Sequence, residues 1–276
     1  MTAVEDTVEV LEEAQGARAG HPGFLKVLSF NMQVGIETHR PRHYVTRSMG
    51  HVLPSRRRMA QLDRIAGLMA GFDLVGLQEA DAGSFRTRGD DQVRYLCDRA
   101  GHDHHSFLLN RNYGRIAQHG IALTGRRAPV AVEQYALPGR VRGRGAIFAE
   151  FAMTSGRLTV VVTHLALVRR DRDRQTAWLA QHLRGASPAI LMGDFNCSIE
   201  ELIDGPLGRL GLCSMEEEAA RRELRPHTYP SWNPQRAIDH VLVSPDIGFR
   251  RMWIPEGGMS DHLPVAAELL LPAPLA

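Results

Sequence analysis

The chain has 276 residues, of which 43% are hydrophobic and 23% are charged, a composition typical of an ordinary globular protein with a large core. No apolar run approaches the roughly 18 residues that suggest a membrane span, and the acidic opening MTAVEDTVEVLEEAQ argues against a secretory signal. The formal net charge of +2 is too small to identify a partner. Cys97, Cys197 and Cys213 form no CxxC pair, so we expect neither a disulfide framework nor a zinc knuckle, and a reducing cytoplasm fits best.

Basic residues gather in two segments of the chain. Residues 39–58 contain no acid and residues 140–144 form a shorter cluster, and their basic residues are Arg40, Arg42, Arg47, Arg56, Arg57, Arg58, His39, His43 and His51, then Arg140, Arg142 and Arg144. Either cluster alone is typical of a solvated basic face. Together they favour an anionic ligand such as a phosphate ester or a nucleic-acid backbone, and we take Arg56 and Arg144 as candidate substrate-binding residues.

The first half of the chain alternates apolar strands with helices. Residues 1–23 are rich in Glu and Gly and predict a flexible acidic tail, so we assign the domain to residues 24–276. A strand is expected over residues 25–31, a long loop over 32–53, a helix over 54–70 and a strand over 73–79. A shorter helix is expected over residues 91–100, ended by Gly101.

The second half is mostly β-structure. Short runs rich in β-branched and aromatic residues predict strands over 105–110, 120–125, 131–137, 146–153 and 158–167. A helix over 172–183, a strand over 189–196, a weak helix over 199–210 and strands over 238–244, 248–254 and 263–271 follow. Strands outnumber helices, which favours sheets packed face to face with helices outside.

Polar residues recur at the ends of these apolar strands. Asn31, Glu79, His164 and Asp194 end strands, Asn196 follows two positions later, and Asp239 and the Asp261–His262 pair lie where strands begin. Taken singly, each is typical of a cap, a turn or a satisfied core histidine. Charged side chains are almost never fully buried without partners, so such positions on apolar elements are costly unless they converge. We therefore expect one shared site.

The residue types suit phosphoester chemistry. Glu79, Asp261 and Asn31 offer hard oxygen ligands, which suit Mg²⁺ or Mn²⁺ better than zinc. A carboxylate–imidazole pair of Asp239 and His262 would fix the histidine tautomer and stabilise its charged form.

Three further residues complete the expected site. Asp194 and Asn196 alternate along an extended chain, so both can point to the same side. A carboxylate there can position water, while the Asn196 amide or a charged His164 can donate to a developing negative oxygen.

The motifs that carry these residues resemble those of the endonuclease/exonuclease/phosphatase superfamily. In the order of that family, the chain contains SFN (29–31), LQE (77–79), THL (163–165), GDFN (193–196), IDH (238–240) and SDHLP (260–264). The resemblance covers about residues 24–270. It implies a four-layer α/β sandwich, in which two mixed β-sheets pack face to face with helices outside.

The resemblance also implies roles for individual residues. It implies Mg²⁺ near Glu79 with Asn31 and Asp261 close by, and hydrolysis of a phosphoester by in-line attack of activated water. His262 resembles the general acid/base residue and Asp239 its orienting partner, while Asp194 resembles the group that positions or deprotonates the nucleophile. Asn196 and His164 would stabilise the transition state. Whether Asp194 or His262 is the base stays open.

Two departures from the family pattern leave the substrate open. Gln33 stands where some members carry an acid, and Tyr113 lies outside any motif that matches the catalytic tyrosine of abasic-site endonucleases. The segment 227–236 precedes IDH and is expected to form a substrate-side loop, where Trp232 or Tyr229 is a candidate to stack on a base or to pack within the loop. The HDHH run, residues 102–105, does not favour a metal site because consecutive strand residues point to opposite faces.

Three functions remain in competition. The arginine-rich segments favour a nuclease-like phosphodiesterase, a monomer whose partner is a phosphoester substrate such as nucleic acid. The small net charge favours a hydrolase of a small-molecule or lipid phosphoester, without stable membrane association because no amphipathic membrane helix is evident. A catalytically dead binding module would have lost a catalytic residue, and we rank it last because the whole set is present.

Overall fold

The structure is a computed structural model that describes residues 23–33, 56–81, 91–112, 118–140, 142–215, 226–256 and 258–276. The expected acidic tail and nearly all of the arginine-rich loop lie outside the described residues, as do Tyr113 and the side chain of Arg56. Gly23, assigned above to the tail, is the first residue of the first strand.

Among the described residues, six strands form the first sheet in the order β10-β11-β1-β2-β4-β3. Strands β1 and β2 are parallel and the other neighbours are antiparallel, so the sheet is mixed. The bounds are β1 Gly23–Asn31, β2 Leu74–Asp81, β3 His104–Asn112, β4 Gln118–Gly125, β10 Gly248–Trp253 and β11 Val265–Leu271.

The second sheet contains five strands within the described part of the chain, in the order β5-β6-β7-β8-β9. It is also mixed, because β7 and β8 are parallel while the other pairs are antiparallel. The bounds are β5 Ala131–Ala136, β6 Gly145–Ala152, β7 Arg157–His164, β8 Ala189–Asp194 and β9 Asp239–Val243.

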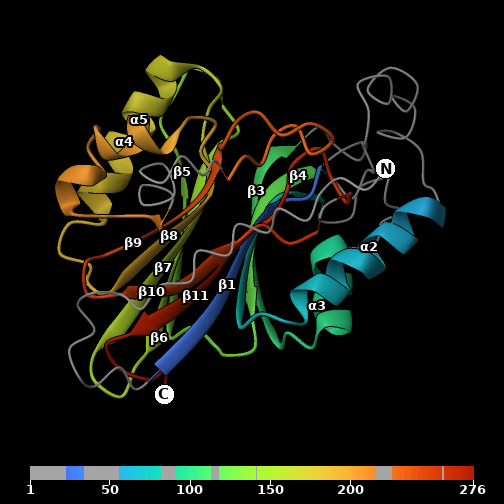
Figure 1. The fold of residues 1–276 in the computed structure, drawn as a ribbon, viewed down its shortest axis with the longest axis horizontal. Helices are drawn as coiled ribbons and strands as arrows, with labels where there is room; N and C mark the ends of the chain where they lie inside the picture. Colours follow the sequence, from blue (N-terminus) through green and yellow to red (C-terminus); the bar gives the residue numbers. More distant parts are fainter. Residues whose placement is uncertain are drawn as a thin grey trace.

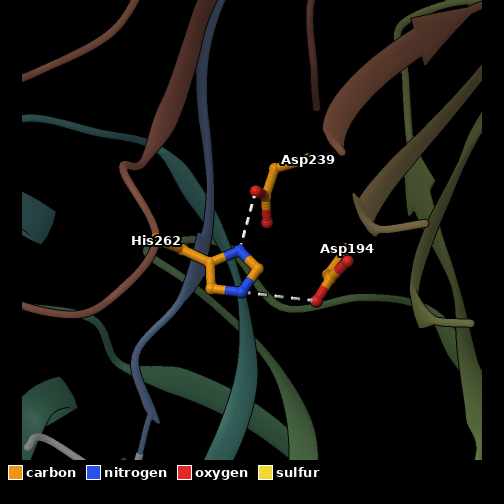
Figure 2. Close-up of side chains that lie close together, drawn as sticks. All are labelled: Asp194, Asp239 and His262. Atoms are coloured by element: carbon orange, nitrogen blue, oxygen red, sulfur yellow. Dashed lines mark hydrogen bonds and ion pairs between the residues drawn. The ribbon is translucent and has the colours of Figure 1, made fainter. Parts of the chain in front are cut away.

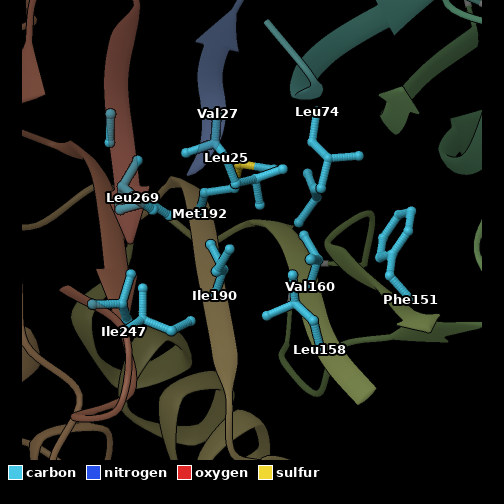
Figure 3. Close-up of a cluster of buried hydrophobic side chains, with 14 of the residues drawn as sticks. Leu25, Val27, Leu74, Phe151, Leu158, Val160, Ile190, Met192, Ile247 and Leu269 are labelled. Atoms are coloured by element: carbon cyan, nitrogen blue, oxygen red, sulfur yellow. The ribbon is translucent and has the colours of Figure 1, made fainter. Parts of the chain in front are cut away.

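The main hydrophobic core lies between the two sheets (Figure 3). Alternate residues of each strand face it, as the period of two along a strand requires; the rows include Leu25 and Val27, Leu158, Val160 and Val162, Ile190 and Met192, and Val241 and Val243. Gly76 of β2 lets the sheets approach, because a Cβ atom there would lie 3.0 Å from a methyl group of Val162.

Helices cover the outer faces of both sheets (Figure 1). Helices α2 (Arg56–Met69) and α3 (Gln92–Ala100) pack on the first sheet through a second apolar cluster, and α4 (Arg169–His182) and α5 (Ile199–Ile203) pack on the second through a third. The four-layer sandwich expected from the family resemblance is therefore confirmed. No helix among the described residues is long and apolar enough to cross a membrane.

The predicted helix bounds agree with the structure for α3 and differ for the segment 199–210 and for α4. Asp91 caps α3 by accepting from the N–H groups of Val93 and Arg94, and Gly101 ends it in the left-handed conformation at φ 69°. Residues 199–210 form only α5 and a 3₁₀ turn, Gly208–Leu210, rather than one helix. Helix α4 begins at Arg169, three residues before the predicted start, because its first turns bury polar side chains that break the apolar pattern.

The inter-sheet core predicts a graded response to truncation of Ile190. Its side chain is fully buried in β8. Ile190→Val should lower the free energy of unfolding by about 0.5–1.5 kcal/mol and Ile190→Ala by about 2–5 kcal/mol, because the second change leaves a cavity. Urea unfolding measures both values. Equally small losses in the two variants would contradict close packing at this position.

Candidate active site

The candidate residues extend the same rows of side chains that form the core. Along each strand the inward-facing row ends in a polar residue: Asn31 on β1, His164 on β7 and Asp194 on β8, while Asp239 begins the row on β9. In the second sheet, Asp194 pairs in register with both His164 and Asp239. The polar groups therefore meet at one mouth of the sandwich, where the carboxyl ends of parallel strands commonly form sites.

Asp194 is the centre of this cluster. Its Oδ2 accepts a hydrogen bond from Asn31 Nδ2 at 3.0 Å and lies 3.3 Å from His164 Nε2 and 3.9 Å from His262 Nε2. Its Oδ1 accepts from the backbone N–H of Asn196 at 3.0 Å. Asn31 belongs to the first sheet and Asp194 to the second, so this hydrogen bond joins the two sheets at the site.

Asp239 and His262 form the expected pair (Figure 2). Nδ1 of His262 donates to Asp239 Oδ2 at 2.9 Å, which leaves Nε2 directed toward Asp194. Burial by itself would lower the pKa of His262, but the Asp239 and Asp194 carboxylates outweigh burial and hold the pKa well above 6.5. These two carboxylates therefore favour the protonated form of the imidazole.

The pKa of Asp194 is also raised, above that of an ordinary carboxyl group in water. Burial raises it to about 7, and the positive charge of His262 opposes part of this rise. Asp194 can thus exchange a proton near neutral pH, beside a histidine that holds one. Such a pair is suited to general acid and base catalysis.

Glu79 reaches the site through a β-bulge. The β2–β4 register passes from Gln78 to Ala80, so Glu79 is the extra residue, and its φ of 56° lies in the left-handed region. By strict alternation Gln78, not Glu79, would share the inward row of Leu74 and Gly76. The bulge instead turns the partly buried Glu79 toward Asn31, with which it forms a hydrogen bond.

The surroundings of Glu79 favour a bound cation. Burial raises the pKa of Glu79 above 4.5, and the Asp261 carboxylate raises it further, while His262 and Arg144 act in the opposite direction. Two carboxylates and the Asn31 amide thus converge in a partly dry place, which fits a hard divalent cation. A second group of ligand atoms, from Asp194, Asp239 and His262, lies within 4.8 Å of one another, but the 2.9 Å hydrogen bond already occupies Asp239 Oδ2 and His262 Nδ1.

The loop before β9 braces the Asp261–His262 segment. The N–H of Ser231 donates to the Asp261 carbonyl at 2.8 Å, and Ser231 Oγ donates to the Ser260 carbonyl at 2.6 Å. The Tyr229 ring packs 4.9 Å from the His262 ring. Sequence reasoning placed Tyr229 on the correct loop but could not show that it packs on the catalytic candidate, because no local signal marks that contact.

A cavity of about 250 Å³ opens beside this cluster. It is lined by Glu79, Asn110, His119, Arg144, His164 and Leu167, together with Gly120 and Gly143. Arg144 therefore lies beside Glu79, whereas half-buried Trp232 does not line this cavity. Sequence reasoning missed Asn110 and His119, since neither belongs to a motif. A second cavity, of about 360 Å³, is lined by Arg172, by residues 196–201, which include Asn196 and Glu201, and by residues of the 226–238 segment.

The histidine-rich run at residues 102–105 does not enter the site. His102 is buried, and its ring nitrogens lie 2.8 Å from Thr124 Oγ1 and 3.1 Å from the Phe72 carbonyl. His104 and His105 begin β3 at the edge of the first sheet. The run is explained by a hydrogen-bonded core histidine and a strand entry.

A family model and several solved structures match this chain. The model of the Endonuclease/Exonuclease/phosphatase family matches residues 28–262. No curated protein matches the chain. Among solved structures, an endonuclease/exonuclease/phosphatase from Beutenbergia cavernae superposes with a TM-score of 0.66 and 20% identity, covering 90% of this chain and 72% of that one.

Two eukaryotic structures share the fold to a similar degree. The human Nocturnin catalytic domain with bound sulfate gives a TM-score of 0.65 at 19% identity, covering 89% of this chain and 94% of that one. TDP2 from D. rerio, in complex with a single-strand DNA product, gives 0.63 at 19% identity, covering 89% and 98%. At these identities the likeness establishes the fold alone.

The left-handed conformation of Glu79 predicts that the site is strained. In protein freed of metal with EDTA, Glu79→Gly should be more stable than Glu79→Ala by about 1 kcal/mol, because glycine adopts this conformation without a Cβ penalty. Both variants lose the carboxylate, so their difference isolates the backbone effect. Thermal unfolding measures it, and an alanine variant as stable as the glycine variant would exclude this conformation.

Proposed function

Since the chain belongs to the endonuclease/exonuclease/phosphatase family, we propose that it hydrolyses a phosphodiester by in-line attack of water, with a divalent metal ion as cofactor. The observation that carries the proposal is the contact of Asp194 with Asn31, His164 and Asn196, beside the Asp239–His262 pair. A carboxylate that exchanges a proton near neutral pH, next to a charged imidazole, is what attack by water and departure of an alkoxide require.

Glu79, Asp261 and Asn31 are the residues that would hold the metal ion, which we propose to be Mg²⁺, with Mn²⁺ as an alternative. When bound, such an ion neutralises phosphate oxygens and stabilises charge on the leaving oxygen. The Glu79 and Asp261 carboxylates support this choice because they offer hard oxygen ligands, to which Asn31 would add its Oδ1, the atom that accepts from the Gln33 N–H at 3.2 Å. The raised pKa of Glu79, caused first by burial and then by Asp261, also supports a nearby positive charge.

Side chains of the protein would transfer protons, stabilise the transition state and bind the phosphate. We assign the general base role to Asp194 and the general acid role to His262. Asp239 fixes the tautomer of His262 through the hydrogen bond from Nδ1. His164 and the Asn196 amide would donate to the phosphate oxygens as negative charge develops there. Arg144, in the 250 Å³ cavity with Glu79, would hold a phosphate oxygen of the substrate.

A nuclease-like substrate is the first candidate. The two cavities lie against different members of the cluster, one against Glu79 and His164 and the other against Asn196, which suits a phosphate with a substituent on each side. The D. rerio TDP2 structure, which shares the fold, contains a single-strand DNA product. Arg56 and Trp232 are proposed as further substrate contacts on the basis of their place in the sequence.

A small-molecule or lipid phosphoester is the second candidate. Leu167 lines the cavity beside Glu79 with 72% of its surface exposed, and Val168 is 58% exposed. Aliphatic side chains at the mouth of a site favour an apolar substituent over a stacked base, for which aromatic side chains are usual.

The catalytic assignment predicts which variants lose activity. With bis(p-nitrophenyl) phosphate and Mg²⁺ or Mn²⁺, Asp194→Asn and His262→Ala should each lower kcat by roughly 10²–10⁴-fold, because each removes a proton-transfer group. EDTA and Glu79→Ala should abolish turnover. Asp173→Asn, an exposed aspartate on α4, is the matched control and should retain full activity. Undiminished turnover in EDTA would refute the metal-dependent mechanism.

Salt dependence distinguishes the two substrate candidates. If single-stranded DNA or RNA is the substrate and two phosphates beyond the reacting one are bound, KM should rise by about tenfold between 50 and 200 mM salt. The KM of thymidine 5′-p-nitrophenyl phosphate, which lacks those phosphates, should change far less. Insensitivity of both KM values to salt, or no turnover of nucleic acid at all, would exclude the nuclease assignment.

A further inference from the structure

Helix α4 buries polar side chains where an ordinary surface helix buries apolar ones. Within its first two turns, Asp171, Arg172 and Gln175 are 2%, 8% and 0% exposed. Burying such groups is costly unless each finds good partners. Their partners are backbone groups and side chains of segments that adjoin the active site.

Arg172 and Gln175 hold the backbone that follows His164. Gln175 Oε1 accepts from the N–H of Ala166 at 2.9 Å. Arg172 Nη1 donates to the carbonyl of Leu167 at 2.6 Å and to that of Ala166 at 3.4 Å. Residues 166 and 167 are therefore fixed to α4 through both donor and acceptor groups.

The same backbone segment orients Asn196. Asn196 Nδ2 donates one hydrogen to the carbonyl of Leu165 at 3.0 Å, which fixes the direction of its second hydrogen. The N–H of Leu165 donates to the Asp194 carbonyl at 2.9 Å. The position of the Leu165 carbonyl thus determines how the Asn196 amide faces the site.

Arg172 reaches the other side of Asn196 as well. Its Nε and Nη2 lie 3.1 and 2.8 Å from Glu201 Oε1, in helix α5. Helix α5 begins at Ile199, three residues after Asn196. The Arg172 guanidinium group therefore connects residues 166 and 167, which follow the Leu165 carbonyl that binds Asn196, with helix α5, which follows Asn196 in sequence.

We propose that Arg172, supported by Gln175, is a positioning residue for Asn196. It fixes the Leu165–Leu167 backbone and α5, so that the free Asn196 hydrogen points at the phosphate oxygen that becomes negative during the reaction. The inference rests on the proposed function, in which Asn196 touches the reacting phosphate. Arg172 lines the 360 Å³ cavity with Asn196, but its guanidinium nitrogens are engaged by the Ala166 and Leu167 carbonyls and by Glu201, which balances its charge. We therefore assign it a positioning role and not a contact with the reacting atoms.

A double-mutant cycle in the full-length protein tests this relation. Arg172→Met should lower kcat by roughly tenfold with KM within twofold, because a slightly misplaced donor loses part of its transition-state hydrogen bond. In an Asn196→Ala background the same change should cost less than about twofold, since no donor remains to be positioned. Arg184→Met, an exposed arginine just after α4, should change neither value.

A spectroscopic readout separates this inference from the function. In metal-free protein, the side-chain amide signal of Asn196, identified by its loss in Asn196→Ala, should shift in Arg172→Met and not in Arg184→Met. If Arg172→Met fails to fold, Gln175→Met, which conserves volume and loses the bond to Ala166, takes its place.

If Arg172→Met lowered kcat equally in the wild-type and Asn196→Ala backgrounds, Arg172 would only stabilise the fold and the inference would be wrong. An Asn196 amide signal that does not shift in Arg172→Met would also overturn it. Failure of the wild-type protein to hydrolyse any phosphodiester would instead refute the proposed function. The amide signal would still report whether Arg172 orients Asn196.

Discussion

The site depends on one hydrogen bond, from Asn31 Nδ2 to Asp194 Oδ2, because it joins the two sheets where they open to solvent. The distance between these atoms is set by the packing of Val27, Val162 and Met192 deeper in the sandwich. Interiors as dense as crystals do not adjust continuously. A core that fixes the separation of the sheets therefore fixes the position of Asp194 relative to the metal-binding candidates on the first sheet.

Local strain accompanies this arrangement. Among the described residues, the non-glycine positions with positive φ are Gln33, Glu79 and Asn196, and all of them adjoin the site. Such conformations cost of order 1 kcal/mol or more each and persist only where the surrounding structure imposes them. Here the bulge holds Glu79, the hydrogen bond to the Leu165 carbonyl holds Asn196, and the hydrogen bond from the Gln33 N–H to Asn31 Oδ1 holds Gln33. Glu79 and Asn196 are residues to which we assign metal binding and transition-state stabilisation, and Gln33 donates to Asn31, which we also assign to the metal ion.

Much of the site could be predicted because it obeys strand alternation. Asn31, His164, Asp194 and Asp239 each share parity with the core residues of their own strand, so the apolar pattern places them on the inner face. Glu79 breaks that parity. Its place at the end of an apolar strand and the motif LQE suggested its role, but no propensity predicts the bulge that turns it into the site. The contact of Tyr229 with His262 and the polar face of α4 were also beyond prediction. The contacts of Tyr229 with His262 and of Arg172 with Glu201 pair residues far apart in sequence. The energies of all these contacts depend on the completed fold.

The charge balance of the site connects the metal with the substrate. A phosphodiester anion that approaches His164 and Asn196 also approaches the carboxylates of Glu79, Asp194, Asp239 and Asp261. The neighbouring positive charges are already engaged, because His262 pairs with Asp239 and Asp194 and Arg144 acts on Glu79. Like charges in a partly dry site repel strongly. Under the proposed function, a divalent cation at Glu79 and Asp261 would therefore strengthen substrate binding, and by thermodynamic linkage the substrate would strengthen cation binding to the same extent.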